Sequence, residues 1–130
     1  KEDFWAHINQ LKRAKEYFDC VFLDPPFFAE TKRGRVDLSE NSARLINKVR
    51  PLINDGGYLI TINNALFLSG IEYMKTLESL CKDGYLELEQ IIPVPKDFTG
   101  YENTRVGKLP VDPNPFNHST KIAVLRIKRK

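Results

Sequence analysis

The residues best suited to chemistry are five in a row, Asp24-Pro25-Pro26-Phe27-Phe28, at the end of a short apolar run. Two successive prolines remove two backbone N–H donors and hold the chain extended, so nearby carbonyl oxygens are left as acceptors without a strand partner. The two aromatic rings offer faces on which a nucleobase can stack, a contact worth roughly 1 to 3 kcal/mol per base. The segment therefore predicts a site for a flat ligand whose edge presents N–H groups. The simpler alternative is that Asp-Pro-Pro ends a strand and both rings are buried under a helix.

The elements that must position this segment alternate along the chain. Apolar residues at helical spacing predict a surface helix over residues 3–16, and the run at 18–23 predicts a strand buried on both faces. Ser69 and Glu72 form a capping box that predicts the start of a further helix. The remaining expected elements are a helix from the Asp37 capping box to about Ile53, a turn at 55–57, a strand at 58–62, the helix at 69–81, and strands at 85–94 and 120–127. This order predicts an α/β fold, a mainly parallel sheet with helices on both faces.

In an open parallel sheet, ligands bind beyond the carboxyl ends of the strands, and Asp24 stands at such an end. The segment 95–118 is too long for an idle connection in a compact domain. It contains aromatic, basic, proline and glycine residues, among them Phe116. The sequence leaves two interpretations open, a lid or substrate loop and a plain exposed loop.

Composition restricts the class of protein. With 130 residues, 42% of them hydrophobic and 28% charged, the chain fits one globular domain, and no apolar run approaches the roughly 18 residues of a membrane span. We expect a cytoplasmic protein, and a chain that starts in mid-protein, since Lys1 is not an initiator Met and no signal peptide follows. The net charge of +3 permits a phosphate-rich partner, although a solvated basic tail is the simpler interpretation.

The sequence offers no support for a metal centre. Cys20 and Cys81 have neither metal-ligand spacing nor a disulfide framework, and both are expected to be packing residues. His7 and His118 are far apart and lack a carboxylate or cysteine cluster at ligand spacing. We therefore expect no bound metal.

Residues 18–27 resemble the (Asp/Asn)-Pro-Pro-(aromatic) motif of class I S-adenosylmethionine-dependent methyltransferases. In that family the motif follows the fourth strand, a Gly-Gly turn precedes the fifth, and an antiparallel strand closes the sheet. The segments at 55–57, 58–62 and 120–127 stand where those features should. Together with the His-Ser-Thr-Lys-Ile block at 118–122, the pattern is most similar to the large-subunit ribosomal RNA methyltransferases. The resemblance covers essentially the whole chain, and only the Asp-Pro-Pro-Phe motif is specific.

The resemblance implies a Rossmann-like methyltransferase fold, S-adenosylmethionine as cofactor, and a nucleobase in RNA, with ribosomal RNA favoured, as substrate. Residues 1–130 would form the C-terminal half of the catalytic domain, without the glycine-rich cofactor half. By the same resemblance the catalytic residues would be Asp24, Pro25, Pro26 and Phe27, the substrate-binding residues Phe28, Asn63 and Asn64, and the cofactor-binding residue Asp24.

Two departures from the family matter. The glycine-rich loop after the first strand and the acidic residue ending the second are not in this chain, which implies weak or no cofactor binding and an inactive fragment. Relatives that methylate C5 of cytosine carry a cysteine after the fifth strand, where this chain has Ile62-Asn63-Asn64. The Asn pair is similar to that of relatives acting on guanine N7, and amides can bond a base edge. Alternatively, both amides satisfy backbone groups at a strand-to-helix turn.

Other functions stay open. The chain could be a non-catalytic Rossmann-like module that binds RNA or a protein, or half of a nicotinamide-dependent enzyme, which the Asp-Pro-Pro-Phe turn and the closing antiparallel strand disfavour. In the family, the strand that ends at Asp24 pairs with the first strand. Its edge would be bare in this chain, which predicts self-association through the exposed sheet edge.

Overall fold

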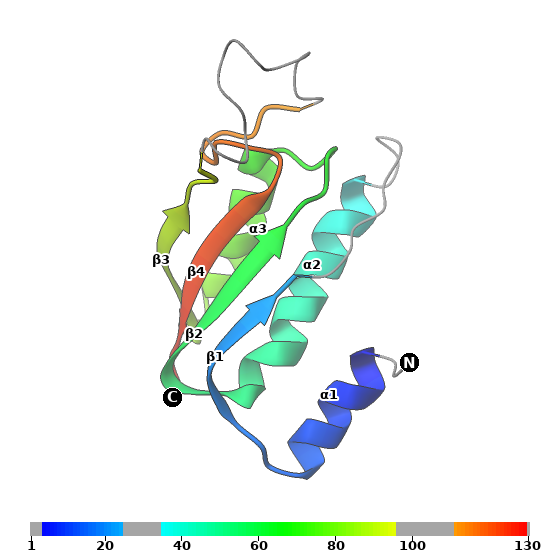
Figure 1. The fold of residues 1–130 in the computed structure, drawn as a ribbon, viewed down its shortest axis with the longest axis vertical. Helices are drawn as coiled ribbons and strands as arrows, with labels where there is room; N and C mark the ends of the chain where they lie inside the picture. The colour runs from blue at the N-terminus through cyan, green and yellow to red at the C-terminus, as the bar shows by residue number, and fades with distance from the viewer. Residues whose placement is uncertain (1–3, 25–34, 96–110, 130) are drawn as a thin grey trace.

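A four-stranded sheet in the order β1-β2-β4-β3 organises the chain (Figure 1). The computed structural model describes residues 4–24, 35–95 and 111–129. The elements in these residues are α1 (Phe4–Arg13), β1 (Phe18–Leu23), α2 (Arg35–Val49), the 3-10 turn η2 (Arg50–Leu52), β2 (Ile53–Asn63), α3 (Gly70–Cys81), β3 (Leu86–Ile92) and β4 (Lys121–Ile127). Strand β1 pairs in parallel with β2, whereas β4 lies antiparallel to both β2 and β3. The α/β class and the antiparallel closing strand are therefore confirmed.

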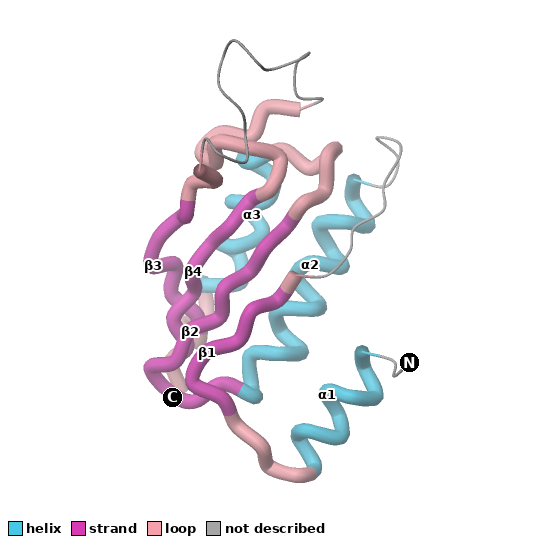
Figure 2. The backbone as a smooth tube through the Cα atoms, viewed as in Figure 1, coloured by secondary structure: helices cyan, strands magenta, loops and turns pink. Residues whose placement is uncertain are grey.

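The helices cover one face of the sheet. Along β2, Leu59 and Thr61 are buried while Ile60 and Ile62 are half-buried, the alternation of a sheet with one covered face. Helices α2 and α3 supply the cover, and both lie behind the sheet in Figures 1 and 2. Helix α1 lies beside α2, where Lys48 donates to the Asn9 side chain (2.7 Å).

The expectation of helices on both faces is thus wrong for the described residues. Strands β1, β2 and β3 follow one another in one direction across the sheet and run parallel. Crossovers between parallel strands are right-handed. Connections that all move in one direction therefore place their helices on the same face.

Strand β1 is an exposed edge and not the buried strand that its sequence predicts. Only Leu23 is buried, whereas Phe18 and Phe22 are 38% and 69% exposed. The prediction failed because, among the described residues, β1 pairs with β2 alone and no helix covers its other face. Cys20 is exposed for the same reason, so its expected packing role is wrong. Cys81 is partly buried, and this burial raises the pKa of its thiol.

The start of α3 confirms the predicted capping box. The Ser69 hydroxyl accepts a hydrogen bond from the backbone N–H of Glu72 (3.1 Å), which satisfies one of the free donors at the helix terminus. The next residue must be glycine, because a Cβ on Gly70 would lie 1.9 Å from the carbonyl oxygen of Pro113. The Gly70 N–H also donates to the Asp112 carbonyl (3.0 Å). These contacts attach residues 111–118 to α3.

Phe116, which the sequence places in a lid or loop, is part of the core. It is 2% exposed, and its ring centroid lies 5.8 Å from that of Tyr73. The Asn117 side chain holds the same segment by donating to the Val94 carbonyl and accepting from the Val94 N–H. Residues 96–110, which make up most of the proposed lid, lie outside the described residues.

Two further boundaries differ from expectation. Helix α2 begins at Arg35, so Asp37 is not its cap; the nearest preceding residue of low helix propensity is Gly34. The expected turn at 55–57 is instead a bulge within β2, where Gly56 has a φ of 81°. The described helices are all too short or too polar to cross a membrane.

Candidate active site

Asp24 and the Asn63-Asn64 pair meet at the carboxyl ends of neighbouring strands. Because β1 and β2 are parallel and Leu23 pairs with Thr61, the residues that follow each strand emerge side by side. Asp24 is exposed there, and so is Asn64. Pro25, Pro26, Phe27 and Phe28 lie outside the described residues. The structure thus brings together one acid and one exposed amide at the edge of the sheet where ligands of such folds bind.

Asn63 is positioned differently from its neighbour. It is 1% exposed, and its Oδ1 accepts a hydrogen bond from the N–H of Ala65 (3.0 Å), which closes the turn after β2. This geometry favours the backbone-satisfying interpretation for Asn63 and leaves Asn64 as the amide available to a ligand. Asn63 Nδ2 is buried without a hydrogen-bond partner among the described residues. A buried unpaired donor costs about 1 to 3 kcal/mol, so an acceptor brought to this atom would be stabilised.

Lys121, which the sequence places in the 118–122 block without predicting a role for it, fixes the same turn. It is 0% exposed, and its Nζ donates to the carbonyls of Ala65 (3.0 Å) and Ser119 (2.7 Å). The ammonium therefore ties the turn after β2 to the segment before β4. Burial lowers the pKa of Lys121 to about 8, an effect that the negative charge of Glu72 opposes. The sequence did contain a signal for the burial of Lys121. Side chains alternate between the two faces of a strand, and Lys121 lies two residues before the buried Ala123 of β4, on the same face.

Near the carboxyl end of β2, a buried group of hydroxyls joins this strand to the helices. Tyr73 of α3 and Thr61 of β2 share a hydrogen bond, and Ser42 of α2 also bonds to the Tyr73 hydroxyl. Burial raises the pKa of Tyr73, and its two hydrogen bonds partly oppose this rise. A small cavity of about 10 Å³ adjoins these side chains and Leu23. The group joins β2, near its carboxyl end, to α2 and α3.

We expect Tyr73→Phe to lower the free energy of unfolding by about 1 to 3 kcal/mol, because it leaves buried hydroxyls without their partner while retaining the aromatic ring. Urea denaturation measures the difference. Tyr17→Phe, at a position 50% exposed, is the control and should change stability by less than about 0.5 kcal/mol. Equal effects of the two substitutions would show that the hydroxyl group does not stabilise the fold.

The histidines have no common site. His118 accepts a hydrogen bond at Nδ1 from the N–H of Thr120 (3.2 Å), a local structural role. Within the parts of the chain that the structure describes, no three His, Cys, Asp or Glu side chains are grouped so that they could hold a metal ion.

Comparison with solved structures defines the class of the fold. A protein assigned as a methyltransferase and solved with SAH superposes on 97% of the chain and 30% of its own length, with a TM-score of 0.70 and 19% identity. A structure assigned as a SAM-dependent methyltransferase of Streptococcus mutans superposes with a TM-score of 0.69 and 16% identity, again over 97% of this chain and 30% of its own length. The chain therefore has the Rossmann-like α/β fold of the S-adenosylmethionine-dependent methyltransferases.

Among curated proteins, the chain resembles the ribosomal RNA methyltransferases. It is 36% identical over 59 residues to the ribosomal RNA large subunit methyltransferase K/L of Shewanella pealeana, a match to 44% of the chain and 8% of that protein. No family model matches the chain. The chain thus spans only a small part of the curated relative and under a third of the two solved structures.

Proposed function

We propose that the chain is the C-terminal half of the catalytic domain of a cytoplasmic S-adenosylmethionine-dependent methyltransferase that modifies a nucleobase in ribosomal RNA. The observation that carries the proposal is the position of Asp24, the first residue of the Asp-Pro-Pro-Phe motif, beside Asn64 at the carboxyl ends of parallel strands. The ribosomal RNA methyltransferase named above supports the choice of RNA. The neighbour solved with SAH supports the choice of cofactor.

In this proposal the chain supplies mainly the substrate side of the site. Asp24 and the Pro25 carbonyl accept hydrogen bonds from N–H groups of the base, while Phe27 and Phe28 stack on it. Asn64 adds an amide that can bond the base edge. Lys121 and Asn63 hold the turn that presents this amide. Fixing the base in line with the methyl donor supplies most of the rate acceleration.

S-adenosylmethionine, when bound, supplies an electrophilic methyl group. As an alternative to its contact with the base, the exposed carboxylate of Asp24 fits the amino acid end of this cofactor, since a carboxylate accepts charge-assisted hydrogen bonds from an ammonium group. The family resemblance assigns the rest of the cofactor site to a glycine-rich loop and an acidic residue outside these 130 residues. We therefore expect the chain alone to bind the cofactor weakly or not at all and to be inactive.

Calorimetric titration of S-adenosylmethionine tests this function. The cofactor is titrated into the 130-residue chain and, in parallel, into a longer protein that joins the chain to a glycine-loop half. Binding by the longer protein alone is the expected result. Binding by neither would overturn the proposal and favour a non-catalytic module that binds RNA or a protein.

We further propose that the chain by itself associates through β1. The strand leaves one edge without a partner among the described residues, and Phe18 and Phe22 are exposed on it. Such edges pair readily with another chain, and an edge lysine is a common means of preventing this. We expect sedimentation velocity at high concentration to find a dimer or larger species, and Phe22→Lys to convert it to a monomer.

The control for this substitution is Ile71→Lys on α3. Ile71 is 53% exposed, so the change removes an exposed apolar side chain and adds a charge without touching a strand edge. It should leave the association unchanged. A monomeric wild-type chain, or an equal loss of association in both variants, would contradict pairing through β1.

A further inference from the structure

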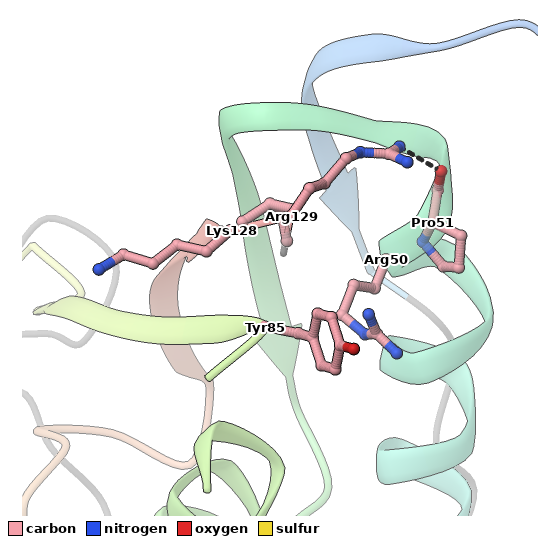
Figure 3. A pocket seen from close by; sticks show the side chains of 6 residues that line it. Arg50, Pro51, Tyr85, Lys128 and Arg129 are labelled. Atoms are coloured by element: carbon pink, nitrogen blue, oxygen red, sulfur yellow. Dashed lines mark hydrogen bonds between the residues drawn. The ribbon is translucent and has the colours of Figure 1, made fainter. Parts of the chain in front are cut away.

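The end of the sheet opposite the candidate active site contains a cavity of about 210 Å³ (Figure 3). It lies where η2 leads into β2, where β3 begins and where β4 ends. The lining residues are Arg50, Pro51, Tyr85, Ile127, Lys128 and Arg129. Three of the six carry a positive charge, and none carries a negative one.

The two arginines of the cavity are fixed by neutral groups. The Arg50 guanidinium carbon lies 4.8 Å from the centroid of the Tyr85 ring, and within the described residues no carboxylate is paired with it. Arg129 Nη2 donates to the carbonyls of Pro51 (2.6 Å) and Ile53 (2.9 Å), as Figure 3 shows for Pro51. These contacts order both guanidinium groups but do not neutralise them.

Lys128 has an acidic partner. Its ammonium forms an ion pair with Glu87, lowers the pKa of that carboxyl, and points away from Arg50 in Figure 3. Both side chains of the pair are about half exposed. Exposed ion pairs of this kind contribute little, so Glu87 is a weak competitor for an incoming anion. Two further acids contact lining residues: Asp55 accepts a hydrogen bond from the Arg129 backbone N–H (2.8 Å), and Asp83 accepts one from the Tyr85 backbone N–H (3.2 Å).

Positive charge continues beyond the cavity toward α1. Lys48 Nζ donates to the Asn9 side chain of α1 (2.7 Å), and partial burial and the charges of Lys48 and Arg50 lower the pKa of Lys12 on the same helix. Lys48 Nζ also lies 5.9 Å from the centroid of the Trp5 ring. We call Lys12, Lys48, Arg50, Lys128 and Arg129 together the basic end. The rings that these cations contact, Trp5 and Tyr85, are half-buried. Cations interleaved with aromatic rings are typical of surfaces that bind nucleic acid.

We propose that the basic end binds backbone phosphates of the RNA substrate, away from the base that is modified. The identity of the ligand rests on the proposed function. A phosphodiester fits because a guanidinium group donates paired hydrogen bonds to phosphate oxygens, and that of Arg50 is already ordered against the Tyr85 ring. Arg129 uses its Nε and Nη2 donors on the Ile53 and Pro51 carbonyls, so it contributes its charge and its Nη1 donors. Such contacts position a strand without reading its sequence.

Fluorescence anisotropy of a labelled RNA hairpin, measured with the 130-residue chain over a series of salt concentrations, tests this surface. The double variant Arg50→Gln, Lys128→Gln is expected to bind about tenfold more weakly at low salt. For this variant, the slope of log K against the logarithm of the salt concentration should be less steep. The expected reduction is about 0.9 for each duplex phosphate that the variant no longer neutralises. The matched control is the pair of substitutions Lys75→Gln, Lys82→Gln on and just after α3, which remove the same charge outside the cavity. Circular dichroism establishes that the variants are folded.

Equal affinities and salt slopes for the two double variants would overturn the proposal. So would displacement of the RNA by a polyglutamate peptide at matched charge concentration, which would indicate an acidic protein as the partner. Failure here is distinguishable from failure of the proposed function. If a longer protein methylates RNA and the double variant leaves its KM for RNA unchanged, only the proposed role of the basic end is refuted. If the longer protein binds no S-adenosylmethionine but still binds RNA in a way that depends on Arg50, only the proposed methyltransferase activity is refuted.

Discussion

Asp24→Ala should lower kcat by about a hundredfold or more in an intact methyltransferase that carries this chain. A loss of this size is the usual effect of removing one preorganised polar group from a reaction centre. Asp24 is the described acid that the parallel pairing of β1 and β2 places beside Asn64. Its carboxylate would orient the base, so its loss would reduce the fraction of bound substrate in reactive alignment. Single-turnover transfer of radiolabelled methyl groups to RNA measures the effect.

The matched control is Asp19→Ala on the same strand. Asp19 is also exposed, and its Oδ1 accepts a hydrogen bond from Asn54 Nδ2 (2.9 Å). This substitution removes a carboxylate from β1 away from the carboxyl end and should leave kcat within about twofold, as expected for a group that makes no contact with the reacting atoms. If Asp24→Ala retained more than half of the wild-type kcat, the assignment of Asp24 to the reaction centre would be wrong.

The second large effect concerns the dependence of stability on pH through Lys121. Below about pH 8 the ammonium is protonated in both the folded and the unfolded chain. Between pH 8 and the ordinary value of 10.5, the folded chain loses this proton while the unfolded chain keeps it, so the free energy of unfolding rises with pH. The gain relative to a variant without the amine should reach about 3 kcal/mol by pH 10.5.

Chemical denaturation of the wild type and of Lys121→Met between pH 7 and pH 10.5 measures this contribution. The comparison is needed because Tyr73 and Cys81 have raised pKa values, so their ionisation in the unfolded chain lowers stability over the upper part of the same range. Both variants share that loss, which cancels in the difference. A difference that does not change with pH would mean that Lys121 does not titrate in a buried environment.

The sequence predicted most of the elements and the position of Asp24 at the carboxyl end of a strand, because hydrophobic periodicity and capping residues are local signals. Ser69 shows this, since its cap is determined within one helical turn. Burial of β1 was predicted wrongly because an apolar run such as that of Phe22 does not reveal whether a neighbouring strand covers it. Lys121 was missed for a related reason, because its hydrogen-bond partner Ala65 lies 56 residues away.

The distinction between Asn63 and Asn64 also required the structure. Asn63 is the last residue of β2 and Asn64 follows it, so strand alternation turns the first amide inward and the second outward. The sequence could not say which one faces inward, because that depends on which face of β2 the helices cover. The hydrogen bond from Ala65 to Asn63 then assigns the inward amide to the turn.

The separation of the two ends of the sheet sets a lower limit on the length of a useful substrate. Phe18 to Leu23 pair with Ile53 to Thr61, and Asn63 lies two residues further, so about seven strand steps, roughly 23 Å, separate the basic end from the candidate active site. An RNA helix must extend over more than about seven base pairs to cover that distance, because its A-form rise per base pair is smaller than the roughly 3.4 Å of B-form DNA. Oligonucleotides shorter than this can occupy one end only, and their methylation should not respond to substitutions at Arg50.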